Sequence, residues 1–307
     1  MSFDGMVLSK TGGRYLVRAG ERTLEASLRG RLKQGNQDPL LVGDVVAILP
    51  HDDGSITIED RRPRRSVLKR RMPGRSRGVR AVAANIDQVV VVGAAALPDW
   101  DPHLMDRFTA VVSANDLPIV MVVNKCDLVD DCAEIAAPYR QVGYTLVVTS
   151  VPERRGLSEL QEFLDGRVSL LMGPTGVGKS SLLNALQPGL QLRTRPVSRR
   201  SQSGRHTTVA AEMHPFGETG FVVDTPGLRD IGLWGLEPPE VAAAFPEIQR
   251  VAPGCRFDNC RHLSEPGCAV VAAVSEGAVA ESRLVSYRQL LEGATQAARP
   301  WSQGRRR

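Results

Sequence analysis

The sequence predicts a multidomain chain: an N-terminal β-barrel, a central α/β domain, and a C-terminal, mainly helical domain. Three observations predict this order. In the first sixty residues, short segments of alternating apolar and polar residues are separated by turns. Short apolar runs typical of buried strands follow, and a compact Cys/His cluster lies near the C-terminal end. At 307 residues the chain is long enough for two or three domains.

The first domain, predicted over residues 1–72, consists of short strands joined by turns. Five such strands indicate a small antiparallel barrel of the oligonucleotide-binding (OB) type. They are expected at Met6–Ser9, Arg14–Arg18, Thr23–Leu28, Asp44–Leu49 and Ser55–Glu59. The alternative is a small β-domain with no ligand of its own, because a fold does not determine a function.

A basic segment follows the barrel. Between Arg61 and Arg80 there are ten Arg or Lys and no Asp or Glu, whereas the whole chain has a net charge of only +5. We expect residues 73–84 to form a basic linker. Neutralising RNA phosphates would make binding by the segment strongly salt-dependent; the alternative is a solvated linker with no partner.

Residues 85–234 are predicted to form an α/β doubly wound domain. Five short runs rich in Val, Ile or Leu are typical of strands buried on both faces of a parallel sheet. These runs are Gln88–Gly93, Ile119–Asn124, Leu146–Ser150, Val168–Gly173 and Phe221–Asp224. Helices are expected at Pro102–Ala114, capped by Asp101, and at Leu157–Leu164. In such domains ligands bind at the carboxyl ends of the strands.

A P-loop pattern follows the fourth of these strands and opens a predicted helix, Lys179–Leu186. Its glycines allow backbone N–H groups to face a phosphate, and the helix N-terminus adds partial positive charge. Lys179 is expected to contact the β- and γ-phosphates, and Ser180 to ligate Mg²⁺. The predicted phosphate-binding residues are Gly173, Pro174, Thr175, Gly176, Val177, Gly178, Lys179, Ser180 and Ser181.

The base is indicated by Asn124-Lys125-Cys126-Asp127, at the end of another predicted strand. The carboxylate of Asp127 can accept hydrogen bonds from the N1–H and amine of guanine, a donor pair that adenine lacks. Lys125 is expected to pack along the base and Asn124 to brace the P-loop, while Ser150 ends the next strand and is a candidate for backbone contacts to the base. A metabolite kinase that uses the P-loop is disfavoured by this motif.

A third motif, Asp224-Thr225-Pro226-Gly227, ends the last strand. We expect Asp224 to hold Mg²⁺ through water and the Gly227 N–H to sense the γ-phosphate. Taken alone, the same residues could form an ordinary strand-to-loop turn.

The catalytic residue is less clearly indicated. Thr207 and Thr208 lie where a switch segment supplies a hydroxyl to Mg²⁺. Leu228 stands where many GTPases have a Gln that orients the attacking water, and a leucine cannot do so. His206 is then the nearest candidate for positioning water, the alternatives being a solvated loop residue or an RNA contact.

The motif order is permuted, because Asn-Lys-x-Asp precedes the P-loop instead of following it. A closed α/β domain tolerates permutation when its natural termini are close together. The switch after Asp224 then leads directly into the C-terminal region. We therefore hypothesise that the nucleotide state is passed mechanically to that region.

The C-terminal domain, predicted over residues 235–307, contains four metal ligands within fourteen residues: Cys255, Cys260, His262 and Cys268. Three thiolates and one imidazole fit a closed, structural zinc site; the alternative is a reduced cluster without metal. A helix is expected within Ala269–Leu291.

The other two cysteines, Cys126 and Cys132, are not expected to be zinc ligands. Five cysteines without an export signal make a disulfide framework improbable, so thiols are expected to be free or metal-bound. No targeting or membrane segment is evident, and we expect a cytoplasmic protein.

In their combination and order, these motifs resemble the circularly permuted ribosome small-subunit-dependent GTPases (the RsgA, or YjeQ, family). The resemblance covers nearly the whole chain, from barrel to zinc module. It implies a bacterial, cytoplasmic GTPase that acts late in small-subunit maturation, binds 16S rRNA near the decoding region, and is stimulated by the subunit. It also supports His206 in catalysis. Val151 departs from the Ala that many GTPases have after the equivalent of Ser150.

The leading hypothesis is thus a monomeric, GTP-hydrolysing assembly factor whose partners are the small ribosomal subunit, 16S rRNA and GTP/GDP, with Mg²⁺ and one structural Zn²⁺ as cofactors. The alternative is a nucleotide-gated RNA-binding module with negligible hydrolysis of its own, which Leu228 favours.

Overall fold

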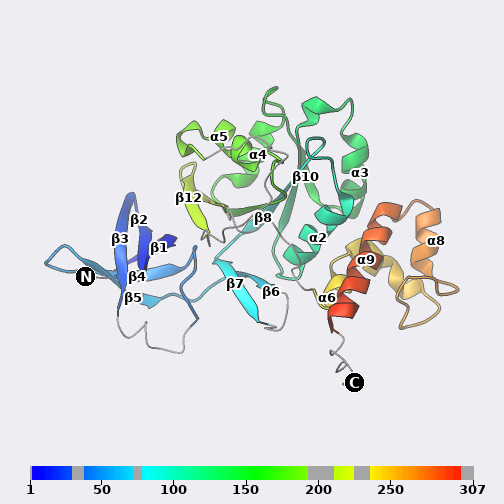
Figure 1. The fold of residues 1–307 in the computed structure, drawn as a ribbon, viewed down its shortest axis with the longest axis horizontal. Helices are drawn as coiled ribbons and strands as arrows, with labels where there is room; N and C mark the ends of the chain where they lie inside the picture. The colour runs from blue at the N-terminus through cyan, green and yellow to red at the C-terminus, as the bar shows by residue number, and fades with distance from the viewer. Residues whose placement is uncertain (1, 30–37, 72–77, 193–210, 225–235, 299–307) are drawn as a thin grey trace, which may run out of the picture.

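The computed structural model describes residues 2–29, 38–71, 78–192, 211–224 and 236–298. The N-terminal barrel, the central α/β domain and the C-terminal helices follow one another along the long axis of the molecule (Figure 1). The predicted architecture is confirmed in all three parts.

The barrel is closed by five strands in the order β1-β2-β3-β5-β4. Its strands are β1 (Phe3–Thr11), β2 (Arg14–Ala19), β3 (Arg22–Leu28), β4 (Val45–Pro50) and β5 (Ile56–Arg61). Alternate side chains fill the interior, among them Val7, Val17 and Ile58, which are all fully buried. The tight β1–β2 turn uses Gly12 and Gly13, both at positive φ, a region that side chains rarely adopt.

Part of the segment that was expected to be a linker belongs to a β-hairpin. Strands β6 (Val67–Arg71) and β7 (Val79–Ala84) pair antiparallel, so residues 79–84 form a strand rather than a linker. The reason is packing: Leu68 and Ala83 are fully buried in the core that the hairpin shares with the central domain. The hairpin also joins the barrel, since Asn85 Nδ2 donates to Gly43 O at 2.7 Å.

The central sheet has six strands in the order β10-β9-β8-β11-β13-β12. They are β8 (Gln88–Ala94), β9 (Ile119–Asn124), β10 (Thr145–Val148), β11 (Val168–Met172), β12 (Glu212–Phe216) and β13 (Gly220–Asp224). Every strand is parallel to its neighbour except β12, which pairs antiparallel with β13 at the edge. Strand β12 was not predicted, because a half-exposed edge strand with a proline lacks the continuous apolar run of the inner strands.

Helices cover both faces of this sheet. They are α2 (Pro102–Ser113), α3 (Ala133–Val142), α4 (Leu157–Leu164) and α5 (Lys179–Leu186), with the 3₁₀ turns η1 (Cys126–Leu128) and η2 (Pro188–Leu190). The predicted cap of α2 is present: Asp101 accepts from the Leu104 N–H at 3.1 Å. Val89 and Val91 of β8 lie in one hydrophobic core and Val90 and Val92 in another, so one core lies on each face of the sheet.

The C-terminal domain is helical. It contains α6 (Pro238–Ala243), α7 (Pro246–Val251), the 3₁₀ turn η4 (Ala252–Gly254), α8 (Ala269–Ser275) and α9 (Glu281–Ala298). The helix expected within Ala269–Leu291 is present as α8, and Gly277 at φ +74° separates it from α9, which begins in the same range. Among the described helices, none is both long and apolar enough to cross a membrane.

A buried ionic cluster joins this domain to the central one. Arg283 of α9 donates to Asp106 of α2 and to Glu247 of α7, both at 2.7 Å, and all three side chains are at most 5% exposed. The guanidinium also lies over the Phe245 ring, 4.4 Å from its centroid. Burial raises the pKa of Asp106, although the charge of Arg283 opposes this shift. The Arg283–Asp106 pair therefore links the two domains, while Glu247 pairs with Arg283 within the C-terminal domain.

Candidate functional site

The phosphate loop connects β11 to α5 at the carboxyl edge of the sheet. Gly173 has φ +145°, and a Cβ on it would lie 2.0 Å from the Val92 carbonyl oxygen of neighbouring β8. Gly178, at φ +99°, precedes the first residue of α5. Only glycine fits the first position, so the loop shape is set by the backbone itself.

The charged and hydroxyl groups of this loop lie at its open side. Lys179 Nζ donates to the carbonyl oxygens of Gly173 and Pro174, at 2.6 and 2.7 Å, and so lies across the loop. Ser180 and Ser181 follow in the first turn of α5 and are half-buried. A helix N-terminus with an adjacent ammonium group is suited to a bound phosphate.

Asp224 ends β13, the strand next to the phosphate-loop strand. The β11–β13 register pairs Leu170 with Val223, so Asp224 reaches the same edge as the loop. The assignment of Ser180 and Asp224 to magnesium stays a prediction. The remaining predicted switch and catalytic residues, His206, Thr207, Thr208 and Gly227, lie outside the described residues.

The guanine motif lies across the sheet edge from this position, at the end of β9. Asn124 is buried, and its Nδ2 donates to the Val177 carbonyl oxygen at 2.8 Å. Its Oδ1 accepts from Thr149 Oγ1 at 2.9 Å, at the end of β10. The Asn124 side chain thus connects the guanine motif to the phosphate loop, the bracing contact expected of it.

Asp127 is positioned by the next strand end. Ser150 Oγ donates to Asp127 Oδ1 at 2.7 Å, and Ser150 is itself completely buried. Lys125, at φ +60°, donates from Nζ to the Leu97 carbonyl oxygen. Burial lowers the pKa of Lys125, and the charge of Asp127 opposes that shift. The ends of β9 and β10 and the β8–α2 loop therefore meet at one turn.

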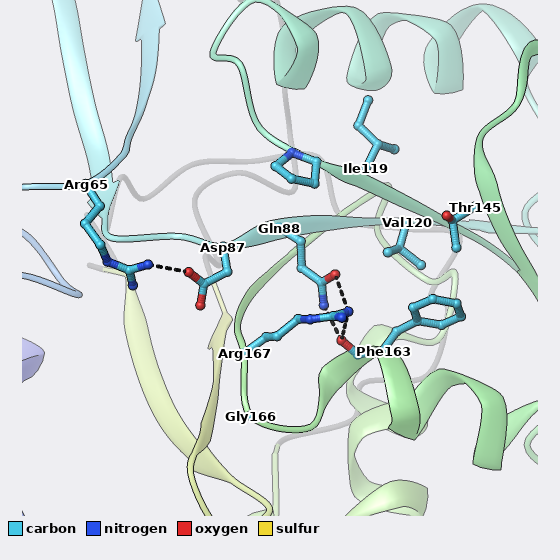
Figure 2. Close-up of a pocket in the computed structure, with 10 residues that line it drawn as sticks. Arg65, Asp87, Gln88, Ile119, Val120, Thr145, Phe163, Gly166 and Arg167 are labelled. Atoms are coloured by element: carbon cyan, nitrogen blue, oxygen red, sulfur yellow. Dashed lines mark hydrogen bonds and ion pairs between the residues drawn. The ribbon is translucent and has the colours of Figure 1, made fainter.

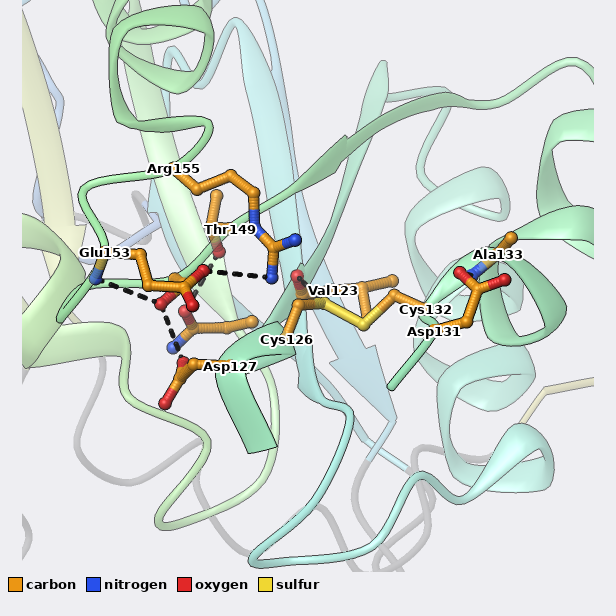
Figure 3. Close-up of a disulfide and its surroundings, with 11 residues drawn as sticks. Val123, Cys126, Asp127, Asp131, Cys132, Ala133, Thr149, Glu153 and Arg155 are labelled. Carbon is orange, nitrogen blue, oxygen red and sulfur yellow. Dashed lines mark hydrogen bonds and ion pairs between the residues drawn. A yellow bond between two sulfur atoms is a disulfide. The ribbon is translucent and has the colours of Figure 1, made fainter. Parts of the chain in front are cut away.

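This turn contains a feature that the sequence analysis had wrong. Cys126 and Cys132 form a disulfide, with their Cα atoms 6.0 Å apart (Figure 3). The expectation of free or metal-bound thiols fails for this pair because η1 folds the chain back at once. Cys132, directly before α3, then comes within the usual Cα spacing of a disulfide.

The four predicted zinc ligands come together in the C-terminal domain. The ligand atoms of Cys255, Cys260, His262 and Cys268 all lie within 4.8 Å of one another. His262 Nδ1 is 3.6 Å from Cys255 Sγ and 3.5 Å from Cys268 Sγ, and these two sulfurs are 4.0 Å apart. Tetrahedral zinc with its usual bond lengths requires roughly 3.5 Å between N and S and 3.8 Å between two sulfurs. The donor set fits one structural zinc ion.

Comparison with known proteins settles the family. A family model described as RsgA GTPase matches residues 61–234, more than half of the chain, and one described as RsgA N-terminal domain matches residues 4–58. The chain belongs to the RsgA GTPase family.

Relatives of similar length carry the same name. A protein from Gemmatimonas aurantiaca named small ribosomal subunit biogenesis GTPase RsgA is 48% identical over 297 residues, which cover 94% of this chain and 96% of that protein. A protein of the same name from Moorella thermoacetica is 41% identical, covering 92% and 94%.

Solved structures agree in fold. YjeQ from Thermotoga maritima is 33% identical, with a TM-score of 0.80, covering 98% of this chain and all of that one. YloQ, described as a circularly permuted GTPase, is 27% identical with a TM-score of 0.75, covering 98% of each chain. The permuted order read from the motifs is thus shared with a solved relative.

In this RsgA-family chain a cavity of about 790 Å³ lies at the opposite edge of the central sheet (Figure 2). Its lining includes the first residues of three strands, Gln88, Ile119 and Thr145. Arg167 Nη1 donates to the Phe163 carbonyl oxygen at 3.2 Å, and Arg65 pairs with Asp87 at 2.9 Å. Because these polar groups already pair with one another, we assign the cavity no ligand.

Sequence reasoning also missed contacts within the RsgA nucleotide site. The hydroxyl of Thr149, the residue before Ser150, donates to Asn124 Oδ1 and so positions that side chain. The Leu97 carbonyl oxygen, which accepts from Lys125, lies in the β8–α2 loop and carries no sequence signal. A buried Thr directly before Ser150 at a strand end was the available hint for the first contact.

Proposed function

We propose that this chain binds GTP at the carboxyl edge of the central sheet, hydrolyses it, and acts in the maturation of the small ribosomal subunit. The observation that carries the proposal is the 2.8 Å hydrogen bond from Asn124 to Val177, because it joins the base-reading motif and the phosphate loop into one pocket. The names of the relatives support the ribosomal role.

In this pocket the residues of 173–181 hold the phosphates, with Lys179 as the cation at the β- and γ-phosphates. Mg²⁺ is held by Ser180 and, through water, by Asp224, and it neutralises charge on the phosphate oxygens when bound. Asp127 accepts from the guanine edge, while Asn124, Lys125 and Ser150 keep that carboxylate and the base in place.

The hydrolysis step is assigned to residues of the switch. His206 positions the attacking water, Thr207 or Thr208 contributes a hydroxyl to Mg²⁺, and the Gly227 N–H contacts the γ-phosphate. Leu228 cannot orient water, so His206 is the candidate for this role. A His206→Ala variant therefore distinguishes a GTP-hydrolysing factor from a nucleotide-gated RNA-binding module that does not hydrolyse GTP itself. Loss of stimulated turnover with intact GTP binding supports His206, and unchanged turnover removes it.

RNA recognition is assigned to the β6–β7 hairpin, with 16S rRNA as the partner. Arg70 and Arg80 are directly opposite in the antiparallel register, a like-charge pair that destabilises a hairpin in isolation. Burial lowers the pKa of Arg70, and the charge of Arg80 lowers it further. Arg70 Nε is also buried with no hydrogen-bond partner among the described residues. A phosphate bound at this pair would reduce the repulsion between Arg70 and Arg80 and would accept a hydrogen bond from Arg70 Nε.

The salt dependence of RNA binding tests this assignment. An Arg70→Gln, Arg80→Gln variant should reduce the slope of log affinity against log salt by about 1–2, because each lost phosphate contact removes roughly one released counterion. Arg14→Gln, on the exposed barrel pair Arg14–Glu25, is the matched control. An unchanged slope would remove the hairpin from the RNA interface.

The decisive experiment measures GTP turnover with and without purified small ribosomal subunits. Turnover should rise by about ten-fold or more with subunits and be lost in Lys179→Ala. Equal turnover in both conditions would contradict the ribosomal role. We further propose that the chain works as a monomer in the cytoplasm, where its partner is assembled; light scattering of the purified protein tests the first point.

A further inference from the structure

The disulfide lies inside the motif that reads the base. Cys126 is the residue between Lys125 and Asp127, and Cys132 directly precedes α3. The bond therefore closes a short ring of chain that contains Asp127 (Figure 3). A covalent link at this position bears directly on the carboxylate assigned to guanine.

Both cysteines of the disulfide are buried. Cys126 is 4% exposed and Cys132 is 7% exposed, and both pack in a small core with Val123 and Ala95. Between them, Leu128 is 47% exposed and Asp130 and Asp131 lie at the surface, whereas Val129 is half-buried against the same core. An exchange reagent therefore reaches the sulfurs only when this short surface segment moves.

Few other contacts fix this segment. The Cys126 N–H donates to the Thr149 carbonyl oxygen at 3.2 Å, and the Asp127 carboxylate accepts from Ser150 Oγ. Beyond Asp127, the Leu128 N–H donates to the Lys125 carbonyl oxygen, and the Asp131 carboxylate accepts from the Ala133 N–H. Both are local bonds, so beyond Asp127 the turn is held to the domain by the disulfide and by the packing of Val129 against the same small core.

We propose that Cys126 and Cys132 form a thiol–disulfide site whose oxidation state sets the affinity of the guanine-binding turn. The inference rests on the proposed role of Asp127 and concerns the regulation of that same pocket. In the disulfide form the turn is ordered before the nucleotide arrives. In the dithiol form the turn becomes ordered only when the nucleotide binds. The entropy lost in ordering it then reduces the net free energy of binding.

The exchange partner is a small-molecule disulfide of the glutathione class. The thiolate of one cysteine attacks a glutathione sulfur, which forms a mixed disulfide and releases one glutathione thiolate. The second cysteine thiolate then attacks the protein sulfur of that mixed disulfide and releases the second glutathione. The protein loses two electrons and two protons, and one glutathione disulfide becomes two glutathione thiols.

Fluorescent GDP binding by the full-length protein tests the proposal. One sample is equilibrated with glutathione disulfide and the other with dithiothreitol, and the zinc content of both is measured. We expect the disulfide form to bind about five-fold more tightly, as ordering a short segment beforehand implies. Trypsin should release the fragment spanning residues 126–140, and its mass, lower by two hydrogens after oxidation, reports conversion. Equal affinity at full conversion, or no conversion, overturns the proposal.

A variant separates this pair from the zinc cysteines. The double variant Cys126→Ala, Cys132→Ala keeps only Cys255, Cys260 and Cys268 and should bind GDP with the same affinity in both buffers. A redox response that persists in the double variant comes from the zinc site and overturns the proposal. The comparison of oxidised and reduced unmodified protein stands even if the variant folds poorly. Failure of both forms to prefer guanosine over adenosine nucleotides would instead contradict the proposed function.

Discussion

The phosphate loop and the guanine-binding turn lie at the same edge of one sheet, yet they are held in different ways. The phosphate loop is shaped by its own backbone, since Gly173 has a φ and a neighbour that no side chain tolerates. The guanine turn is held from outside itself, by Thr149, Ser150 and the disulfide between Cys126 and Cys132.

The difference teaches which parts of a site can be changed separately. The affinity of a backbone-defined loop cannot be changed in small steps, because a substitution at Gly173 either fits or displaces the chain. A turn held by side chains can be loosened one contact at a time, and a single bond between two sulfurs can be made or broken without changing the sequence. The predictions below test this contrast in order of expected effect.

The largest change in free energy is expected for a substitution far from both loops. It should lower the stability of the fold without changing the geometry of the nucleotide site. Arg283→Met leaves two carboxylates, Asp106 and Glu247, buried without their cation. We expect the free energy of unfolding to fall by about 3–5 kcal/mol, measured by urea denaturation, with GDP affinity nearly unchanged. The control Arg62→Met removes an exposed pair with Asp4 and should cost less than about 1 kcal/mol. Similar losses in both variants would contradict the ionic role of the cluster.

Within the site, Gly173→Ala should have the largest effect. The added Cβ meets the Val92 carbonyl oxygen, so the loop must move and the phosphates lose their backbone donors. We expect GDP and GTP to bind about 100-fold or more weakly by calorimetry. Gly189→Ala in η2, where an added Cβ meets nothing within 4 Å, is the matched control and should bind normally. Normal binding by Gly173→Ala would show that the loop is not backbone-defined.

Asn124→Ala tests the contact that joins the two regions. It removes the bond to Val177 and leaves the buried Thr149 hydroxyl without its acceptor, a loss of about 1–3 kcal/mol. Guanosine nucleotides should therefore bind roughly ten-fold more weakly. The control Asn115→Ala removes comparable bonds to Lys69 on the hairpin and should leave nucleotide affinity unchanged. Equal losses in both variants would indicate a general loss of stability.

The smallest effect is expected for Thr149→Val, which keeps the shape of the side chain and removes one hydroxyl. Loss of a single hydrogen bond to Asn124 corresponds to about 1 kcal/mol, or roughly five-fold weaker GDP binding. Thr109→Val makes the same change at an equally buried position on α2 and should not affect binding. If Thr149→Val weakened GDP binding as much as Asn124→Ala, the guanine turn would not lose affinity one contact at a time, and the contrast with the phosphate loop would fail.

The same contrast explains how much of the molecule could be predicted from its sequence. The strands and the phosphate loop were predictable because their patterns are local: apolar runs, a glycine spacing and a following helix. The predicted α4 and β9 have the bounds found in the structure. The zinc ligands were predictable for the same reason, since all four lie in one short segment.

What could not be predicted depends on contacts between distant segments. The β6–β7 hairpin forms because Leu68 packs in the core of another domain, which its basic composition conceals. The role of the Thr149 hydroxyl depends on where two strands end relative to each other. The disulfide was missed because the whole-chain argument from cysteine number and compartment carries no information about the local path of the chain at Cys126.

Strand β13 has a further consequence for how this chain works. It lies between β11 and β12 in the sheet. Because it runs parallel to β11, the chain leaves it at the same edge as the phosphate loop, after Asp224. The next described helix is α6, the first of the C-terminal domain. The tether of that domain therefore starts at the residue assigned to magnesium. Under the hypothesis that the nucleotide state is passed to the C-terminal domain, the change would travel along the polypeptide chain itself and would not need a series of side-chain contacts.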